Sequence, residues 1–474
     1  MGELGTFYWS SFVCTAALCI ALQLYARGED KKQAARSSAD TSKNPPSQRF
    51  AAFQRNYILV YLLAMFADWL QGPYVYELYV SYGFDQQAIA ELFVCGFLSS
   101  MVVGTFVGGL ADKLGRKNAC LLYCVSYILA CFTKLVPDYW VLMLGRFLSG
   151  VSTSLLFSVF ESWMVCEHKQ QGFDSSLLGD TFSNAVFGNG LVAVAAGFVA
   201  NFAANSFGNV APFVVAILPL GLVMVVICSS WNENYGNQSL NMLSSLRQGF
   251  ELVQSDSRIA ALGLAQSCFE GAMYTFVFMW TPALKSGEAN LTVNDTEVVT
   301  DYLGTIFAVF MVCIMVGSSI FKISSQRPKN LYNIPLYLHA VGVASMAGVT
   351  IFLENKSIVY MCFLLFETTV GIFWPAYGVI KSEKIPEDIR SAVMNIFRIP
   401  LNAFVVLLLL KVKYLDSRTV FTICTLAHAV SFACYYYFYS TLKNSELDDK
   451  SEGSTEMVNR ISDLDALLEK DENA

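Results

Sequence analysis

The stretch GGLADKLGRK, residues Gly108 to Lys117, separates two long apolar segments and places one acidic and three basic side chains within ten residues. Charged residues are otherwise sparse: the 474-residue chain is 55% hydrophobic and only 15% Asp, Glu, Lys and Arg. Such a composition is typical of a protein that crosses a membrane many times. We therefore interpret the stretch as a short polar loop between two membrane-spanning helices.

Long apolar segments occur along the whole chain on both sides of this loop. Because about 20 apolar residues cross a bilayer as one helix, the sequence predicts thirteen crossings. Their ranges are 5–26, 57–80, 87–110, 119–136, 139–160, 180–204, 210–231, 259–284, 301–323, 333–354, 357–380, 389–411 and 418–441. We expect an all-α membrane protein whose main partner is the lipid bilayer.

A polar stretch at 232–258 divides the last twelve crossings into six and six. The expected parts are an extra N-terminal transmembrane anchor helix (1–26), a basic cytosolic linker (27–56), an N-terminal six-helix bundle (57–231), a central cytosolic loop (232–258), a C-terminal six-helix bundle (259–441) and an acidic cytosolic tail (442–474). The first helix has Glu3 before it and basic residues after it, the reverse of a secretory signal. We expect an uncleaved anchor, with a cleaved signal peptide as the alternative.

The distribution of Lys and Arg predicts the orientation, because short cytosolic loops carry an excess of both. With the loop Gly108–Lys117 in the cytosol, that side holds nineteen Lys and Arg before the tail and the opposite side holds six. The C-terminus is then cytosolic. Asn290 and Asn294 begin N-x-Thr sequons in an outer loop and are expected to be glycosylated, whereas Asn237 faces the cytosol and should stay bare.

The loop resembles the G-x-x-x-D-[RK]-x-G-[RK]-[RK] signature that major facilitator superfamily transporters carry between their second and third helices. The matching residues are Gly108, Asp112, Lys113, Gly115, Arg116 and Lys117. The superfamily's Arg-x-x-x-Gly in helix 4 is matched by Arg146 and Gly150, whereas the helix-5 glycine-proline motif lacks its proline here. The resemblance implies a major facilitator fold in which the loop acts as a conformational switch, and Glu161 is the expected partner of Arg116. A generic basic cytosolic loop is the alternative.

Three further strings resemble the eukaryotic molybdate-anion transporter family, as does the extra N-terminal helix. They are ADWLQGPYVYELY (Ala67–Tyr79), FVFMWTP (Phe276–Pro282) and NIFRIPL (Asn395–Leu401). This resemblance covers the chain from about residue 5 to 440. It implies a secondary active transporter of a small oxyanion, with molybdate as the favoured substrate and proton coupling as an option.

Ionisable residues deep inside a crossing are costly in hydrocarbon and are functional candidates for that reason. Numbering the last twelve crossings, they are Asp68 in helix 1, Arg146 in helix 4, Glu270 in helix 7, Glu367 in helix 10 and Arg398 in helix 11. Four of the five lie on every third helix, the period of an inverted three-helix repeat whose corresponding helices meet near the midplane. We expect them to face one polar chamber.

In that chamber Arg146 and Arg398 are expected to coordinate the oxyanion, and at least one carboxylate is expected to carry a proton. Structural ion pairs, Glu367 with Arg398 and Asp68 with Arg146, are the alternative. Three acids against two bases would also suit a cation or a neutral solute. Neighbours that would complete the chamber, each of which plain packing would equally explain, are Trp69, Gln71, Tyr74, Tyr274, Trp280, Trp374 and Asn395.

Other classes of function find little support. The net charge of −7 arises largely after Leu442, where ten Asp and Glu stand against four Lys and Arg, so we expect no nucleic-acid partner. The 13 Cys show no C-x-x-C pair or Cys/His cluster, so we expect no bound metal. The sequence also contains no nucleotide-binding loop and no nucleophile-base arrangement, so we expect no cofactor and no enzymatic activity. His339 and His428 are expected to be satisfied core residues. The competing function is a facilitator-fold receptor or scaffold that no longer transports.

The acidic tail is expected to be disordered apart from a short helix at 457–468. Its segment Asp463–Leu468 fits the acidic dileucine pattern that sorting adaptors bind. We expect a monomer in the plasma membrane, with an endosomal or vacuolar membrane as the alternative.

Overall fold

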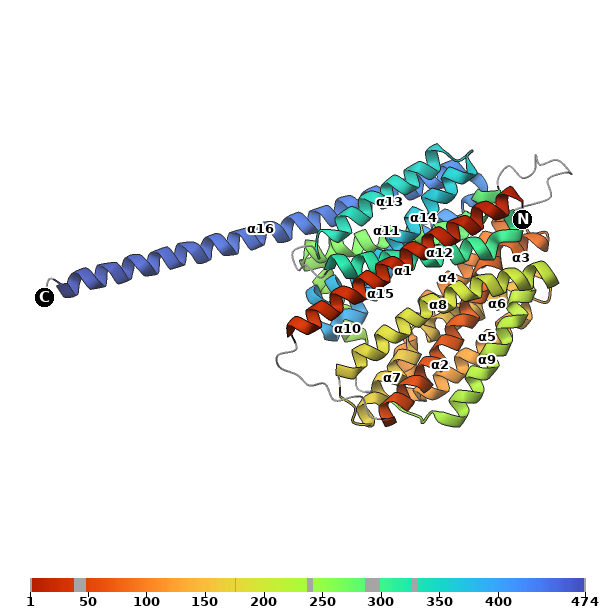
Figure 1. The fold of residues 1–474 in the computed structure, drawn as a ribbon, viewed down its shortest axis with the longest axis horizontal. Coiled ribbons are helices and arrows are strands. Elements are labelled where there is room, and N and C mark those ends of the chain that lie inside the picture. Colours follow the sequence, from red (N-terminus) through yellow and green to blue (C-terminus); the bar gives the residue numbers. More distant parts are fainter. Residues whose placement is uncertain are drawn as a thin grey trace.

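The computed structural model describes residues 2–37, 48–174, 176–236, 242–285, 299–325 and 331–472, and within these ranges every regular element is a helix (Figure 1). The α-helices are α1 (Glu3–Ser37), α2 (Gln48–Gln71), α3 (Val75–Ser81), α4 (Gln86–Leu114), α5 (Arg116–Thr133), α6 (Tyr139–Leu156), α7 (Val159–Gln170), α8 (Ser176–Phe207), α9 (Ala211–Ser230), α10 (Met242–Ser255), α11 (Ser257–Lys285), α12 (Leu303–Ser325), α13 (Ile334–Ile351), α14 (Lys356–Lys384), α15 (Glu387–Leu409) and α16 (Ser417–Glu472). Short 3-10 turns are η1 (Gly72–Tyr74), η3 (Val299–Tyr302) and η5 (Val412–Tyr414). The predicted all-α class is confirmed.

Side-chain caps determine where several of the long helices begin. Asp85 accepts the Ala88 N–H at 2.8 Å before α4, and Asp138 accepts the N–H groups of the second and third residues after it at 3.0 Å before α6. Asn355 does the same for Ile358 before α14. Each cap satisfies a backbone donor that the helix leaves unpaired and stabilises the helix by about 1 kcal/mol. The sequence therefore fixes these starts locally.

Eleven stretches within the described residues are long and apolar enough to cross a membrane. Helices α5 and α11 are not among them, although both run through the bundle beside the others (Figure 1). α5 has only 18 residues and begins with Arg116 and Lys117, while α11 contains Arg258, Glu270 and Lys285. Because α11 is buried along most of its length, it does not need an apolar surface. These two helices and the eleven stretches take the places of the thirteen predicted crossings.

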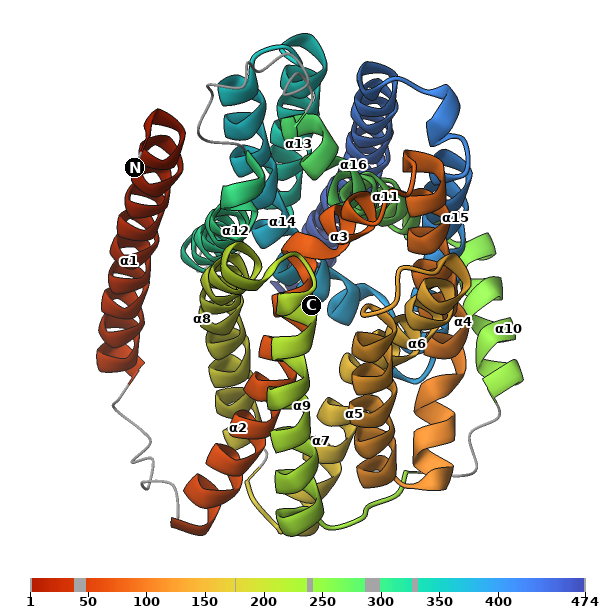
Figure 2. The same cartoon turned by 90° about the vertical axis from the view of Figure 1, so that its right-hand side faces the viewer.

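The helices form two halves, α2–α9 and α11–α16, which Figure 2 shows side by side. At one end of the bundle, called the closed face below, polar contacts join the halves. The Lys285 ammonium of α11 donates to both carboxylate oxygens of Glu77 of α3, at 2.8 and 2.7 Å. The Gln87 amide of α4 donates to the Leu410 carbonyl at 3.3 Å.

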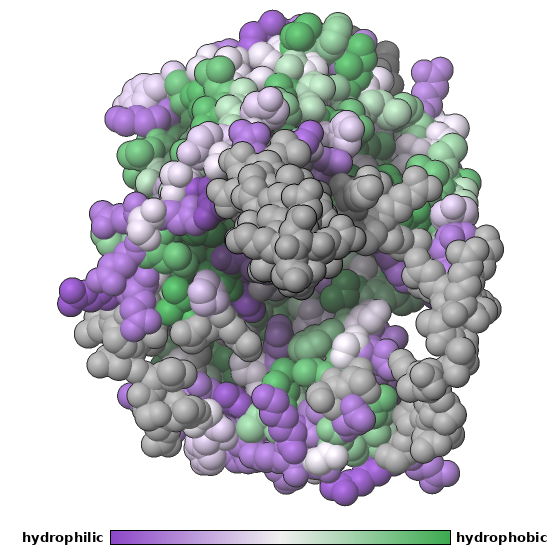
Figure 3. Space-filling model, turned by 90° about the vertical axis from the view of Figure 1, so that its left-hand side faces the viewer, coloured by the Kyte–Doolittle hydropathy of each residue, from purple (hydrophilic) through white to green (hydrophobic). Residues whose placement is uncertain are grey.

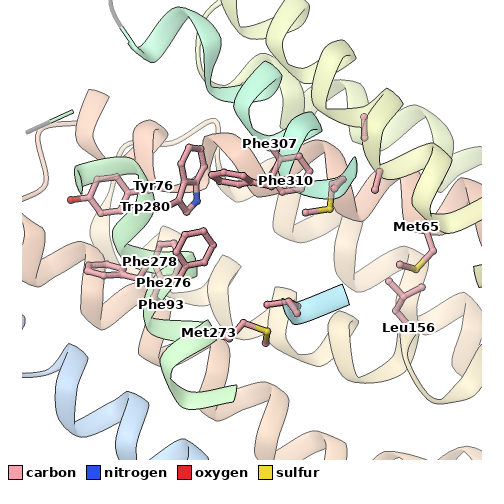
Figure 4. Close-up of a cluster of buried hydrophobic side chains, with 14 of the residues drawn as sticks. Met65, Tyr76, Phe93, Leu156, Met273, Phe276, Phe278, Trp280, Phe307 and Phe310 are labelled. Carbon is pink, nitrogen blue, oxygen red and sulfur yellow. The ribbon is translucent and has the colours of Figure 1, made fainter. Parts of the chain in front are cut away.

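Aromatic rings fill the space just inside these contacts (Figure 4). The Phe278 ring of α11 meets Tyr76 and Phe93 of the N-terminal half edge-on, at centroid distances of 5.4 and 5.3 Å. One layer deeper, Phe97 of α4 contacts Tyr274 of α11 at 5.2 Å. The rings exclude water from the seam between the halves, so the closed face is sealed.

The opposite end of the bundle, called the tail face below, is the end from which α16 projects (Figure 1). The polar contacts of the closed face have no counterpart between the two halves there, among the residues that the structure describes. Seen from this end, the surface is hollowed beside the projecting tail, and both polar and apolar residues border the hollow (Figure 3). The structure is thus closed at one face and open toward the other.

Helix α1 lies outside the two halves, against α12 (Figure 2). The Gln23 amide donates to the Ser319 hydroxyl of α12 at 2.8 Å. The Trp9 ring stacks on Phe198 of α8 with centroids 5.2 Å apart. The extra helix therefore packs on the C-terminal half and reaches the N-terminal half through aromatic contact.

Three segments predicted to lack regular structure are partly helical. α1 continues to Ser37 and α2 starts at Gln48, both inside the expected linker, and α10 lies within the expected central loop. α16 runs unbroken to Glu472 through the tail that was expected to be disordered. Once an apolar helix is formed, adding residues costs little because nucleation has already occurred.

Candidate functional site

Three charged side chains of the C-terminal half gather at mid-depth in the bundle. Glu270 of α11 is 5% exposed and accepts a hydrogen bond from the Gln266 amide at 2.7 Å. Lys381 of α14 and Arg398 of α15 are its electrostatic neighbours. None of the three charged groups forms an ion pair within 4 Å with another described residue. Both bases are therefore available to a ligand.

Arg398 lies midway along α15, yet its side chain is exposed. It is directed at α4 of the other half, because a Cβ placed on Gly104 would lie 3.6 Å from Arg398 Nη1 and 3.3 Å from Ser154 Oγ. A guanidinium at this depth requires water or counter-charges around it. The exposed Arg398 side chain therefore borders the space between the halves, in keeping with the hollow at the tail face.

Arg146 does not join this cluster. Its Nε donates to the Leu92 carbonyl at 3.2 Å and its guanidinium lies over the Phe93 ring at 4.8 Å. A Cβ on Gly96 would come within 2.6 Å of Arg146 Nη2. Gly96 and Gly104 are the α4 residues that lie next to Arg146 and Arg398, respectively. They are eight residues, or about 12 Å, apart along the helix. The arginines expected to share one oxyanion do not meet in this conformation.

The expected structural ion pairs do not form either. Asp68 accepts a hydrogen bond from the Tyr127 hydroxyl at 2.6 Å, and Arg146 is not its partner. Glu367 is buried beside Cys313 of α12. Neither Asp68 with Arg146 nor Glu367 with Arg398 lies within 4 Å among the described residues, so this alternative is wrong for both pairs. Asp68 and Glu367 therefore each have surroundings that include neither arginine.

Trp69, Gln71 and Tyr74, expected to line the chamber, lie toward the closed face instead. The Trp69 Nε1 donates to the Asn189 side chain of α8 at 2.8 Å, and the Tyr74 hydroxyl donates to Asn201 of α8 at 3.2 Å. The Gln71 amide donates to a backbone carbonyl of its own helix at 3.3 Å. Trp69 and Tyr74 therefore join α2 and η1 to α8.

The other residues expected to line the chamber do not all lie in one place. Tyr274 is an electrostatic neighbour of Glu270, one helical turn away on α11. Asn395 is partly exposed on α15, and Trp374 is exposed on α14. Trp280 is buried among the rings at the closed face (Figure 4). Tyr274 therefore belongs with the charged cluster, and Trp280 does not.

The signature loop turns at Gly115, whose φ of +100° favours glycine. Arg116 Nε and Nη2 each lie 2.8 Å from Asp112 Oδ1, and Nη1 donates to the Ser162 carbonyl at 3.1 Å. Glu161 forms no ion pair with Arg116, although both residues line one cavity of about 380 Å³. The prediction of Glu161 as the partner is wrong, because Asp112 lies four residues earlier and is within reach of the same guanidinium.

The same loop binds the segment that leaves the N-terminal half. The Glu233 carboxylate accepts the backbone N–H groups of Lys117 at 2.8 Å and Asn118 at 3.1 Å, and so caps α5. The Lys117 ammonium donates to the Trp231 carbonyl at 2.7 Å. Lys113 is exposed. Sequence reasoning missed Glu233, whose only signal was its place in the polar stretch after the sixth crossing of the N-terminal bundle.

Two further bases were also missed. Lys381 lies one residue beyond the predicted crossing 357–380 and was counted with the loops, but α14 continues to Lys384. Lys134 was counted in an outer loop, but it is 1% exposed and its ammonium donates to the Tyr79 hydroxyl at 2.6 Å. A long side chain at a helix end can bend back into the bundle, so a count of loop charges does not reveal where the ammonium lies.

The two histidines in apolar helices differ. His339 Nε2 lies 2.8 Å from the Tyr377 hydroxyl and Nδ1 lies 3.1 Å from the Ser431 hydroxyl, so its expected satisfaction is confirmed. His428 is fully buried, and neither ring nitrogen has a hydrogen-bond partner in the described part of the chain. Its ring packs edge-on against Phe269 at 5.0 Å. The prediction is wrong for His428.

Within the described residues, no group of three or more His, Cys, Asp and Glu is placed to hold a metal. The sequon residues Asn237, Asn290 and Asn294 lie outside the described residues, as do the side chains of the dileucine segment.

Comparison with known proteins identifies relatives of this chain. A family model described as sugar transporters with 12 transmembrane helices matches residues 7–371. A molybdate-anion transporter of Xenopus laevis is 34% identical over 428 residues, which cover 87% of this chain and 91% of that protein. The Danio rerio molybdate-anion transporter is 34% identical over 427 residues, covering 83% and 84%. The chain belongs to the molybdate-anion transporter family. This confirms the resemblance seen in the sequence and makes the protein a transporter of the major facilitator superfamily.

Solved structures confirm the fold. A nucleoside transporter matches with a TM-score of 0.66 at 12% identity, over 82% of this chain and 99% of that one. A D-xylose-proton symporter matches with a TM-score of 0.59 at 14% identity, over 83% and 98%. At these identities the likeness concerns the arrangement of the two six-helix halves and not the substrate.

Proposed function

We propose that this chain transports molybdate, or a small tetrahedral oxyanion of the same charge, by alternating access between its halves. The observation that carries the proposal is the placement of Lys381 and Arg398 as electrostatic neighbours of Glu270 inside the bundle, with the Arg398 side chain exposed between the halves. The relatives named for molybdate suggest which anion it is. The excess of Lys and Arg supports a cytosolic tail face.

The two bases suit a dianion for different reasons. The Arg398 guanidinium offers parallel N–H donors in a fixed plane that match two oxygens of a tetrahedral anion. The Lys381 ammonium supplies a compact charge on a flexible stem. Two positive charges balance the two negative charges of molybdate, so the anion is bound without a net charge in the bundle.

Glu270 offers a means of coupling. Its carboxylate interacts electrostatically with the same two bases, and an ionised Glu270 would repel an entering dianion. Protonation of Glu270 removes that repulsion, because like charges in one site disfavour each other. We therefore propose that a proton accompanies the anion and that Glu270 carries it.

Uptake into proteoliposomes containing the purified chain tests the function. The panel comprises radioactive molybdate, sulfate and, because the family model is described for sugars, D-xylose, each with and without an inward proton gradient. We expect molybdate uptake that the gradient stimulates. Uptake of D-xylose without uptake of molybdate would replace the proposed substrate.

The site is tested by Lys381→Gln, with Lys384→Gln as the matched control. Lys384 lies on the same helix but over the Tyr332 ring, 5.2 Å from its centroid. Losing a charge-assisted hydrogen bond of about 1.5–3 kcal/mol should raise KM for molybdate by about tenfold or more, whereas the control should transport normally. Equal KM values for the two variants would place the anion site elsewhere.

We also propose a glycosylated monomer in the plasma membrane. The sequons of Asn290 and Asn294 follow α11, which ends at the closed face, and that face is the outer one if the tail is cytosolic. Glycosidase treatment should shift the gel band of the wild type and not that of the Asn290→Gln, Asn294→Gln double variant. A shift that depends on Asn237 instead would invert the topology.

A further inference from the structure

A cavity of about 500 Å³ lies at the closed face, where α1 meets the two halves, and the function proposed above makes no use of it. It is bordered by α1, by the end of α8 and by η3 with the start of α12. The lining residues are Trp9, Phe198, Asn201, Phe202, Asn205, Asp301, Tyr302 and Thr305. Half of these are aromatic.

The aromatic residues form an apolar wall that faces the bilayer side of the bundle. Trp9 and Phe198 stack with their planes 8° apart, and Tyr302 lies close to α1 through its contact with Tyr8 at 5.8 Å. Phe202 is 69% exposed. Trp and Tyr side chains concentrate at the level of the lipid headgroups. The cavity therefore lies at the depth where a lipid headgroup meets its acyl chains.

The charge of the cavity has one sign. Asp301 is the ionisable acid in the lining, no Lys or Arg lines it, and Asp301 forms no ion pair with a described residue. An anion would be repelled here, so the cavity is not a second site for the transported oxyanion.

We propose that this cavity binds the quaternary ammonium group of a phosphocholine lipid. Aromatic faces around a carboxylate are the arrangement that recognises quaternary ammonium ions, because the ring quadrupoles and the acid attract a cation that cannot donate hydrogen bonds. The acyl chains of a lipid continue along the exposed apolar surface of α1 and α8. Phosphatidylglycerol, an anionic lipid, lacks the group that the cavity selects.

A lipid in this position contacts three parts of the molecule at once. It touches α1, the N-terminal half through α8 and the C-terminal half through η3 and α12. Asn205 of α8 already donates to the Asp301 carbonyl at 2.9 Å across the same seam. The bound headgroup would therefore strengthen the junction of the two halves at the closed face.

Photo-crosslinking of the purified full-length chain tests the proposal. The probe is a phosphatidylcholine with a photoactivatable group near the headgroup, and labelled peptides are mapped by mass spectrometry. Unlabelled phosphatidylcholine, phosphatidylethanolamine and phosphatidylglycerol compete in separate arms, and a further arm contains soluble choline. We expect labelling of peptides from α1 and α8, with phosphatidylcholine the best competitor by about fivefold or more.

The variants are Asp301→Asn, which keeps the shape and removes the charge, and Trp9→Ala, which removes one ring. Phe207→Ala is the matched control, because Phe207 is 75% exposed at the same end of α8 but does not line the cavity. We expect Asp301→Asn and Trp9→Ala each to lower labelling about fivefold to tenfold, with the control unchanged. If one variant fails to fold, as judged by thermal melting, the other still decides.

Three results would overturn the proposal. Equal competition by phosphatidylglycerol would remove the selection for a cation. Equal labelling of Asp301→Asn, Trp9→Ala and Phe207→Ala would remove the cavity as the site. Full displacement of the probe by micromolar choline would assign the cavity to a soluble quaternary ammonium ion instead of a lipid. Transport of molybdate is measured separately, so failure here leaves the proposed substrate unaffected.

Discussion

Replacing Lys285 by Gln removes one partner of the ion pair that joins α11 to α3 at the closed face. The side chains of Lys285 and Glu77 are 23% and 8% exposed, so water screens the pair only in part. An exposed ion pair contributes about 0.2–1 kcal/mol, and breaking a buried pair costs about 3–5 kcal/mol. For this partly screened pair we take an intermediate value of about 2 kcal/mol. Because the pair spans the two halves, it stabilises only the closed-face conformation. Its loss should move the equilibrium about 30-fold toward opening of this face.

Distances between nitroxide labels measure this shift. Trp140 of α6 and Tyr414 of η5 are strongly exposed and belong to different halves, so Cys at these two positions reports separation of the halves in a background without reactive native cysteines. We expect Lys285→Gln to add a longer-distance population in liposomes. The reversed pair, Glu77→Lys with Lys285→Glu, should return the distribution toward that of the wild type. An unchanged distribution in Lys285→Gln, or a reversed pair that behaves like the single variant, would refute the role of this ion pair as a lock.

Two further predictions concern glycines at close contacts. A Cβ at Gly371 would lie 2.1 Å from a carbonyl oxygen of α12, so Gly371→Ala should lower the stability measured in thermal melts by about 2–3 kcal/mol. Gly378→Ala on the same helix is the control and should melt like the wild type, because a Cβ there would meet nothing within 4 Å. Equal melting temperatures of the two variants would contradict the close packing at Gly371. Gly104→Val places methyl groups in the space beside Arg398, so it should lower molybdate uptake without lowering the melting temperature, and wild-type uptake would show that this space is not part of the anion's path.

Much of the fold could be predicted from local properties of the sequence. Long apolar stretches must form helices in a bilayer, because each backbone N–H and C=O has to be bonded within its own segment. The loop Gly108–Lys117 identified the superfamily because its glycines and charges meet a requirement of the backbone turn, which Gly115 satisfies with its positive φ. Helix α11 was also predicted correctly although it contains Glu270, because the residues on either side of Glu270 are mostly apolar. These features depend on near neighbours in the chain.

The pairing of charged residues could not be predicted in the same way. Depth along a helix says how costly a charge is, but the direction of its side chain depends on which helix faces it. Arg146 and Arg398 both lie well inside their predicted crossings, yet they meet glycines of α4 that are about 12 Å apart along the helix. Lys381 was missed because the predicted crossing stopped one residue short of it. The cluster around Glu270 emerges only when α11, α14 and α15 are packed together.

The position of α1 has a consequence for how the chain is made. Gln23 hydrogen-bonds to Ser319, which lies 296 residues further along the chain. Helix α1 therefore contacts a helix that the ribosome completes much later. At about 5–20 residues per second, α1 waits about 15–60 s in the membrane before its docking surface on α12 exists. During that interval the amide of Gln23 faces lipid or a temporary partner. Biogenesis of this protein therefore includes a late step in which an early helix, already inserted, moves sideways onto a bundle assembled after it.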